Sequence, residues 1–154
     1  MTNESAGTPT YHLDHVCLAV RKIAPARAML ERMLGYSART APITNTRQQV
    51  TVQFMEKLDS IDIKLIEPSS PASPLVEFVK SRGGGLHHLA FKTEAVLIGI
   101  RDLESKGAKL LTQPEPGEAF CDSLIAFAFL GSGLNIELID TDLRLGESSE
   151  VIAK

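Results

Sequence analysis

The chain has 154 residues, 44% of them apolar and 23% charged, which is enough apolar material for one ordinary globular core. Its formal net charge of −3 excludes the strongly basic surface that binds nucleic acid or an anionic membrane. Residues 1–10 lack the apolar core of a signal peptide, no apolar run could span a bilayer, and the two distant cysteines predict no disulfide framework. We therefore expect a cytoplasmic protein with no nucleic-acid or membrane partner.

The first half of the chain is predicted to form one β-α-β-β-β module, residues 11–70, after a disordered N-terminus at residues 1–10. A strand-forming run begins at His15. Helical apolar spacing follows it from Pro25, which suits a first helical turn, to Gly35, which suits a stop. Three further runs predict strands, the first of them weak: 40–43, 49–56 and 61–67.

The second half repeats this order. A linker at residues 71–84 contains two prolines, a predicted short helix at 75–82 and the first two of three consecutive glycines. Module two, residues 85–140, begins with a strand at His88 and continues into a helix that ends at a glycine. Its later strands are predicted at 109–112, 124–130 and 134–139. Residues 141–154 form a polar tail to which no structure is assigned.

Four residues that can carry chemistry recur at one fixed spacing. His15 and His88 are 73 positions apart, and so are Lys64 and Glu137. Two modules that pack around a pseudo-twofold axis bring equivalent strand positions to one central cavity. We therefore expect these four side chains to face one another there, and we expect function in that cavity.

Strand alternation turns His15, His88 and Glu137 away from the apolar side of their strands. His87 should point to the opposite side from His88 and is interpreted as a structural histidine. Two imidazoles and a carboxylate are a sensible ligand set for zinc, manganese, cobalt, nickel or iron(II), with open positions for a substrate. A histidine–glutamate hydrogen-bond network without a metal is the alternative.

The strand predicted at 49–56 alternates polar and apolar side chains. Thr51 and Gln53 share one face, and Val50, Val52 and Phe54 share the other. We predict that Thr51 and Gln53 contact a substrate in the cavity, while a place on the surface is the ordinary alternative for such residues.

Four stretches carry a family resemblance: Leu-Asp-His-Val-Cys-Leu-Ala-Val at 13–20, Ile-Lys-Leu-Ile-Glu-Pro at 63–68, Gly-Gly-Leu-His-His-Leu-Ala-Phe at 84–91 and Ile-Glu-Leu at 136–138. With these motifs the chain resembles the vicinal oxygen chelate superfamily of glyoxalase and bleomycin-resistance proteins, most closely its methylmalonyl-CoA epimerase branch. The resemblance implies an α+β fold in which two βαβββ modules form a cup-shaped mixed sheet. It also implies a divalent metal in the cup and a homodimer.

Carried over to this chain, the four metal positions of the family fall on His15, Lys64, His88 and Glu137. The family has glutamine or glutamate where this chain has Lys64. An ammonium group about 3 Å from a divalent ion would be repelled by roughly 11 kcal/mol at an effective dielectric constant of 20. A lysine that coordinates the ion must first lose its proton, which costs roughly 4.6 kcal/mol at neutral pH.

Three interpretations of Lys64 follow. In the first, Lys64 moves aside or is neutral, so that His15, His88 and Glu137 hold the metal. In the second, Lys64 replaces the metal and pairs with Glu137. In the third, Lys64 and Glu137 act as an acid–base pair on opposite faces of a substrate carbon.

The resemblance implies an enzyme, an isomerase, epimerase or lyase, that removes the proton next to the carbonyl of a small carbonyl compound or acyl thioester. The metal would polarise the carbonyl, Glu137 is the first candidate for the base, and Lys64 is the second catalytic candidate. The alternative is a metal-free ligand-binding or resistance protein on the same fold. Two loops at the mouth of the cup, 116–122 and 127–133, depart from the branch's pattern, so coenzyme A is not assumed to be part of the ligand.

Overall fold

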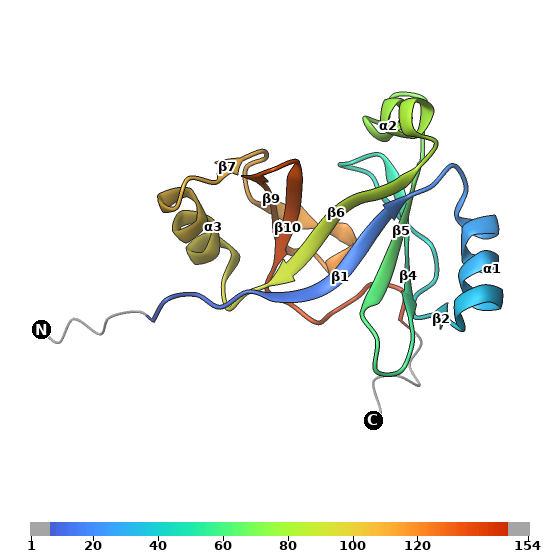
Figure 1. Ribbon diagram of the computed structural model, residues 1–154, viewed down its shortest axis with the longest axis horizontal. Coiled ribbons are helices and arrows are strands. Elements are labelled where there is room, and N and C mark those ends of the chain that lie inside the picture. The colour runs from blue at the N-terminus through green and yellow to red at the C-terminus, as the bar shows by residue number, and fades with distance from the viewer. Residues whose placement is uncertain (1–6, 148–154) are drawn as a thin grey trace, which may run out of the picture.

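The computed structural model describes residues 7–147, which form one mixed β-sheet with helices outside it (Figure 1). The elements in chain order are β1 (His12–Ala19), α1 (Ile23–Leu34), β2 (Ser37–Ala38), β3 (Ile43–Asn45), β4 (Val50–Glu56), β5 (Asp62–Pro68), α2 (Leu75–Arg82), β6 (Gly85–Lys92), α3 (Val96–Ser105), β7 (Lys109–Leu110), β8 (Glu115–Gly117), the 3₁₀ turn η1 (Glu118–Phe120), β9 (Ser123–Gly131) and β10 (Leu134–Ile139). Residues 1–6 of the N-terminus predicted to be disordered over residues 1–10, and residues 148–154 of the predicted tail, lie outside the described residues.

The sheet consists of two equivalent halves. Its strand order is β2-β4-β5-β1-β6-β10-β9-β7, so each half reads outward from the central β1–β6 pair in an equivalent way. The histidine strand of each module is parallel to the last long strand of the same module, and β1 and β6 are antiparallel to each other. The short strands β3 and β8 pair with β4 and β9. Two βαβββ modules in an open mixed sheet confirm the predicted α+β fold.

Helices α1 and α3 lie on opposite sides of the molecule, with the paired strands β1 and β6 running between them (Figure 1). Ile23 and Leu30 of α1 pack on one half of the sheet, and Val96 and Ile100 of α3 pack on the other. A third apolar cluster, which includes Phe54, lies inside the cup. None of the helices within residues 7–147 is long and apolar enough to cross a membrane.

One of the three consecutive glycines, Gly84, is required by a close backbone approach. Helix α2 ends at Gly83, which has a left-handed φ of 74°. Gly84 has a φ of 102°, and a Cβ added there would lie only 2.7 Å from the carbonyl oxygen of Ala19. A side chain at this position would therefore push the linker away from the end of β1.

Residues 141–147 of the polar tail make defined contacts, which the sequence pattern did not predict. The Ala41 backbone N–H donates to the Gly146 carbonyl at 3.0 Å, and the Leu145 N–H donates to the Ala119 carbonyl at 3.0 Å. Arg144 is buried at 4% exposure. The correction has a physical reason: this segment is held by main-chain bonds and ion pairs to distant residues, which leave no apolar periodicity in the sequence.

Candidate functional site

The register of β1, β5, β6 and β10 brings the four repeated residues together at the centre of the sheet. His15 and Glu137 have no exposed surface, while Lys64 and His88 are 3% and 4% exposed. The structure therefore places side by side the residues that the repeat predicts to meet.

The carboxylate of Glu137 is the hub of this cluster. The Nζ atom of Lys64 lies 3.3 Å from both of its oxygens, and the Nε2 atoms of His15 and His88 lie 3.2 and 3.7 Å from Oε1. Burial opposes ionisation, but the charge of Lys64 holds the pKa of Glu137 well below its usual value. Glu137 is therefore an ionised carboxylate paired with an ammonium group.

Two phenylalanine rings enclose one side of the cluster. The Nζ atom of Lys64 lies 5.1 Å from the ring centroid of Phe120 and 5.8 Å from that of Phe54. The imidazole of His15 meets the Phe54 ring edge to face, with centroids 5.2 Å apart. The rings exclude water and favour the cation at their faces. The sequence did not identify Phe120, because η1 lies in a loop without a periodic pattern.

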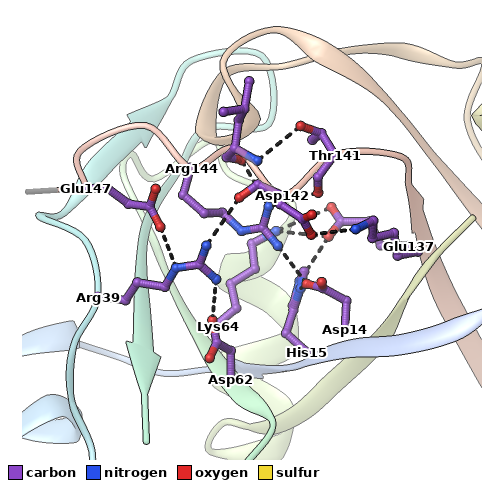
Figure 2. A network of polar contacts seen from close by, with 12 residues as sticks. Asp14, His15, Arg39, Asp62, Lys64, Glu137, Thr141, Asp142, Arg144 and Glu147 are labelled. Atoms are coloured by element: carbon purple, nitrogen blue, oxygen red, sulfur yellow. Dashed lines mark hydrogen bonds and ion pairs between the residues drawn. The ribbon is translucent and has the colours of Figure 1, made fainter. Parts of the chain in front are cut away.

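His15 is held by a carboxylate that the sequence analysis did not single out. Its Nδ1 lies 2.7 Å from Oδ2 of Asp14, and Arg144 donates from Nη2 to the same oxygen at 2.6 Å (Figure 2). The register shift between Leu13 and His15 makes Asp14 the extra residue of a β-bulge. This bulge lets the side chains of two consecutive residues lie side by side.

The Asp14 carboxylate fixes the tautomer of His15. Burial would raise the pKa of Asp14, but the hydrogen bond from His15 and the charge of Arg144 hold it below its usual value. An ionised carboxylate only accepts hydrogen bonds, so the Nδ1 of His15 carries a proton and its Nε2 faces Glu137. Asp14 and Arg144 are 130 residues apart, and nothing in the sequence pairs them.

His87 lies beside His88 and not on the opposite side of the strand, which corrects the expectation from strand alternation. A second register shift, between Cys17 and Leu18, leaves His87 as the extra residue of β6. Its Nδ1 lies 2.8 Å from the Nδ1 of His88. Burial, and next the neighbouring His88, lower the pKa of His87 to about 4.

A cavity of about 410 Å³ opens beside the buried cluster. Lys64 and His88 belong to its wall, whereas His15 and Glu137 do not. Both modules and the linker contribute its other wall residues, which are Arg47, Gln48, Val50, Ile66, Pro74, Leu75, His87, Leu111, Thr112, Glu115, Phe127 and Asn135. A ligand in this cavity would meet Lys64 and His88 first, with Glu137 behind them.

Thr51 and Gln53 are not part of the cavity wall. Val50 lines the cavity, and alternation along β4 sends Thr51 and Gln53 to the α1 side of the sheet. Gln53 lines a separate hollow beside α1 and donates from Nε2 to the Thr40 carbonyl at 2.9 Å. The predicted substrate contacts are corrected accordingly: β4 is buried on both faces, so a polar residue does not mark the cavity side.

Within residues 7–147 there are two groups of three side chains whose donor atoms could meet at one metal ion. In the first, the predicted set of His15, His88 and Glu137, the donor atoms lie within 4.8 Å of one another. Neither Nε2 in this set has a hydrogen-bond partner. The second set is Cys17, His87 and His88, but burial raises the pKa of Cys17 to about 12, so its thiol stays protonated at neutral pH.

Lys64 does not fit a metal held by the first set. A divalent ion bound about 2 Å from Glu137 would lie within about 5 Å of an ammonium group that is itself 3.3 Å from both carboxylate oxygens. At an effective dielectric constant of 20 the repulsion is about 7 kcal/mol. His15, His88 and Glu137 offer suitable ligands, and Lys64 as placed competes with the ion for the same carboxylate.

The two-module sheet and the central cluster define the class of this protein. Residues 14–127 match the family model of the Glyoxalase/Bleomycin resistance protein/Dioxygenase superfamily. The chain therefore belongs to that superfamily, and the resemblance seen in the motifs is confirmed.

Its relatives and structural neighbours include epimerases. It is 33% identical over 105 residues to an ethylmalonyl-CoA/methylmalonyl-CoA epimerase of Cereibacter sphaeroides, covering 68% of this chain and 77% of the relative. It is 34% identical over 99 residues to the uncharacterized protein YqjC of Bacillus subtilis, covering 64% and 69%. The methylmalonyl-CoA epimerase of Mycobacterium tuberculosis superposes with a TM-score of 0.75 at 25% identity, covering 92% and 91% of the two chains. A methylmalonyl-CoA epimerase in complex with methylmalonyl-CoA and NH4+ superposes with the same score at 24% identity, covering 88% and 96%.

Proposed function

We propose that the protein is an enzyme of the isomerase class that binds a small carbonyl compound or acyl thioester and transfers the proton next to its carbonyl group. One observation carries the proposal: Lys64 and His88 share the wall of one cavity, while the ionised Glu137 lies behind them. The names of the relatives point to malonyl-type thioesters as the first substrate class to test.

Lys64 is the electrophilic group in this proposal. Its ammonium has three N–H donors, and the two oxygens of Glu137 account for two of them. The third can donate to a ligand carbonyl oxygen in the cavity and stabilise the negative charge that develops there. In a protease, loss of one donor that stabilises a developing oxyanion lowers kcat by about 100-fold to 1,000-fold, and we expect an effect of this order here.

His88 is the proton acceptor in this proposal. Burial lowers the pKa of His88, and the nearby Glu137 offsets this only in part. The imidazole is therefore neutral at pH 7. Its Nε2 is buried and has no hydrogen-bond partner among the described residues, so rotation of the ring toward the cavity would present Nε2 to a ligand. This nitrogen receives the proton of the C–H bond next to the carbonyl, and the electron pair of that bond forms the enolate whose oxygen Lys64 stabilises.

Glu137 has a different role here from the base that the sequence suggests. It has no exposed surface, and its low pKa makes it a weak proton acceptor. It instead holds Lys64 toward the cavity, and the Nε2 of His15 lies 3.2 Å from its Oε1. Glu137 is a positioning residue. A water molecule in the cavity gives a proton to the opposite face of the enolate carbon, and His88 releases its proton to solvent, which completes an epimerisation.

The cavity wall also suits an acidic ligand. Arg47 is exposed and lines the same cavity as Lys64, so it offers a guanidinium group to a ligand carboxylate. One structural neighbour holds methylmalonyl-CoA together with an ammonium ion, which is the kind of cation that Lys64 carries. A malonyl-type thioester combines the carbonyl and the carboxylate that these two side chains accept.

The test is exchange of the α-proton of methylmalonyl-CoA in D₂O, followed by proton NMR against a protein-free control. We expect the wild-type protein to accelerate exchange, Lys64→Met to slow the catalysed rate by about 100-fold or more, and His88→Gln to abolish it. Lys22→Gln removes the same charge from a lysine whose side chain is 75% exposed and outside the cavity, and should exchange at the wild-type rate.

Two results would reject this function. Equal catalysed rates in the wild type and in Lys64→Met would exclude Lys64 as the electrophile. Exchange at the protein-free rate with both methylmalonyl-CoA and ethylmalonyl-CoA, accompanied by saturable binding of either thioester, would instead support the metal-free binding protein, for which the Lys64–Glu137 pair is a structural element.

A further inference from the structure

We propose that Lys64 is a built-in replacement for a divalent metal ion, and that removing its ammonium group converts His15, His88 and Glu137 into a metal site. This inference concerns the same cluster as the proposed function and deepens it. Its test is a measurement of metal binding, which does not depend on whether the protein turns over any substrate.

The position of the ammonium group is the first support. A metal shared by His15, His88 and Glu137 would have to lie close to Oε1 of Glu137, which both Nε2 atoms approach. The Nζ atom of Lys64 already lies 3.3 Å from this oxygen and from its partner oxygen. The resident ammonium therefore satisfies the carboxylate whose charge would attract the ion.

The balance of buried charge is the second support. Two cations, Lys64 and Arg144, face two carboxylates, Glu137 and Asp14, through contacts of 3.3 and 2.6 Å. A divalent ion would add two positive charges to a centre that is already neutral in sum. Because Lys64, Glu137 and Arg144 are almost completely buried and Asp14 is only 16% exposed, water screens little of the excess.

The aromatic enclosure is the third support. Phe54 and Phe120 hold the Lys64 ammonium 5.8 and 5.1 Å from their centroids, and the guanidinium of Arg144 lies 4.8 and 4.7 Å from the same two centroids. If Lys64 moves into the cavity to make room for an ion, it loses both ring contacts and its pairing with Glu137.

The two histidines explain why a metal site should appear once the ammonium is gone. Their Nε2 atoms are buried without hydrogen-bond partners, and Asp14 already fixes the tautomer of His15 that leaves Nε2 free to ligate. Glutamine at position 64 would add a neutral amide oxygen as a fourth ligand. Methionine there would remove the charge and leave the three ligands unchanged.

The experiment is a Co²⁺ titration of metal-free wild-type protein, Lys64→Gln, Lys64→Met and the surface control Lys22→Gln, read by calorimetry and visible absorption. We expect both Lys64 variants to bind one Co²⁺ per chain at least about 100-fold more tightly than the wild type and the control. Adding His15→Ala to Lys64→Gln should abolish the gain. Absence of a thiolate-to-cobalt absorption band separates this site from one that uses Cys17.

The wild-type titration tests the proposal even if a variant folds poorly. The proposal would be overturned if the wild type bound one Co²⁺ per chain as tightly as Lys64→Gln and lost this binding in His15→Ala. Well-folded Lys64 variants that gain no affinity would overturn it as well. Thermal unfolding with and without Co²⁺ checks folding, and a metal-dependent rise in Tm is expected only for the two Lys64 variants. If α-proton exchange continued in the presence of a chelator but the Lys64 variants gained no affinity for Co²⁺, the proposed function would stand and the metal-replacement proposal would be rejected.

Discussion

The two modules present their histidines in equivalent positions but surround them differently. The residue before His15 is Asp14, and the residue before His88 is His87. Each preceding side chain lies beside the Nδ1 of its histidine, at 2.7 and 2.8 Å, and each stands at a register shift of the β1–β6 pair. The same backbone irregularity therefore supports a charged partner in one module and a neutral one in the other.

We call the enclosed surroundings of His15 the closed wall and the cavity-lining surroundings of His88 the open wall. His15 lies behind Phe54 and Phe120, bonded to a carboxylate that the tail residue Arg144 also holds. His88 lies on the cavity wall with the neutral His87. The repeat sets the positions of both histidines, whereas their neighbours make one a support and leave the other exposed to a ligand.

The largest difference between the two walls should appear on removal of a ring from each. Phe120→Ala removes a ring that is 1% exposed and packs near His15, so we expect a loss of about 4 kcal/mol in the free energy of unfolding. Phe127→Ala removes the ring beside His88, which lines the cavity and is only half-buried, and should cost about 2 kcal/mol. Urea denaturation measures both, and equal losses would contradict the closed and open description.

The two preceding residues should differ in the same direction by a smaller amount. Asp14→Asn leaves the buried guanidinium of Arg144 without its carboxylate, and we expect a loss of about 3 kcal/mol in the free energy of unfolding. The equivalent change His87→Asn removes a neutral hydrogen bond and should cost about 1 kcal/mol. The comparison fails if urea unfolding gives the larger loss for His87→Asn.

The smallest effect distinguishes the walls by pH. The pKa of His87 falls to about 4 in the fold, so between pH 6.5 and 4 the unfolded chain binds more protons and acid lowers stability. His87→Asn should therefore flatten part of this loss. The pKa of Asp14 is below its usual value, so its contribution is present above about pH 4 and is lost only at lower pH. In Asp14→Asn, the free energy of unfolding should therefore change with pH between 7 and 4 as steeply as it does in the wild type.

Much of the fold follows from local pattern. The stops at Gly35 and Gly107, the helix at 75–82 and the long strands of both modules were all legible in the sequence, because helical and strand periodicities are properties of neighbouring residues. The recurrence of His15 as His88, and of Lys64 as Glu137, at one spacing of 73 residues also predicted that these four side chains meet in one central site. Equivalent strand positions lie close together when two repeated modules pack around a pseudo-twofold axis.

Other parts of the site had no local signal. Phe120 belongs to a turn without periodicity, and Arg144 reaches Asp14 from a tail that pairs with residues far away in the chain. The bulges at Asp14 and His87 break the alternation on which the placement of side chains was based. Alternation holds along β4, but the face with Gln53 lies toward α1 and not toward the cavity, and the polar residues did not reveal this because both faces of β4 are buried.

The sequence by itself determined the repeat, the fold class and the identity of the four central residues, since these depend on spacing along the chain. Only the tertiary structure decided that Lys64 and His88 line the cavity while Glu137 and His15 stand behind them. It also decided that the ammonium of Lys64 rests on the carboxylate of Glu137. These outcomes depend on how strands, rings and tail pack around one another, and packing between distant segments is not encoded in any local pattern.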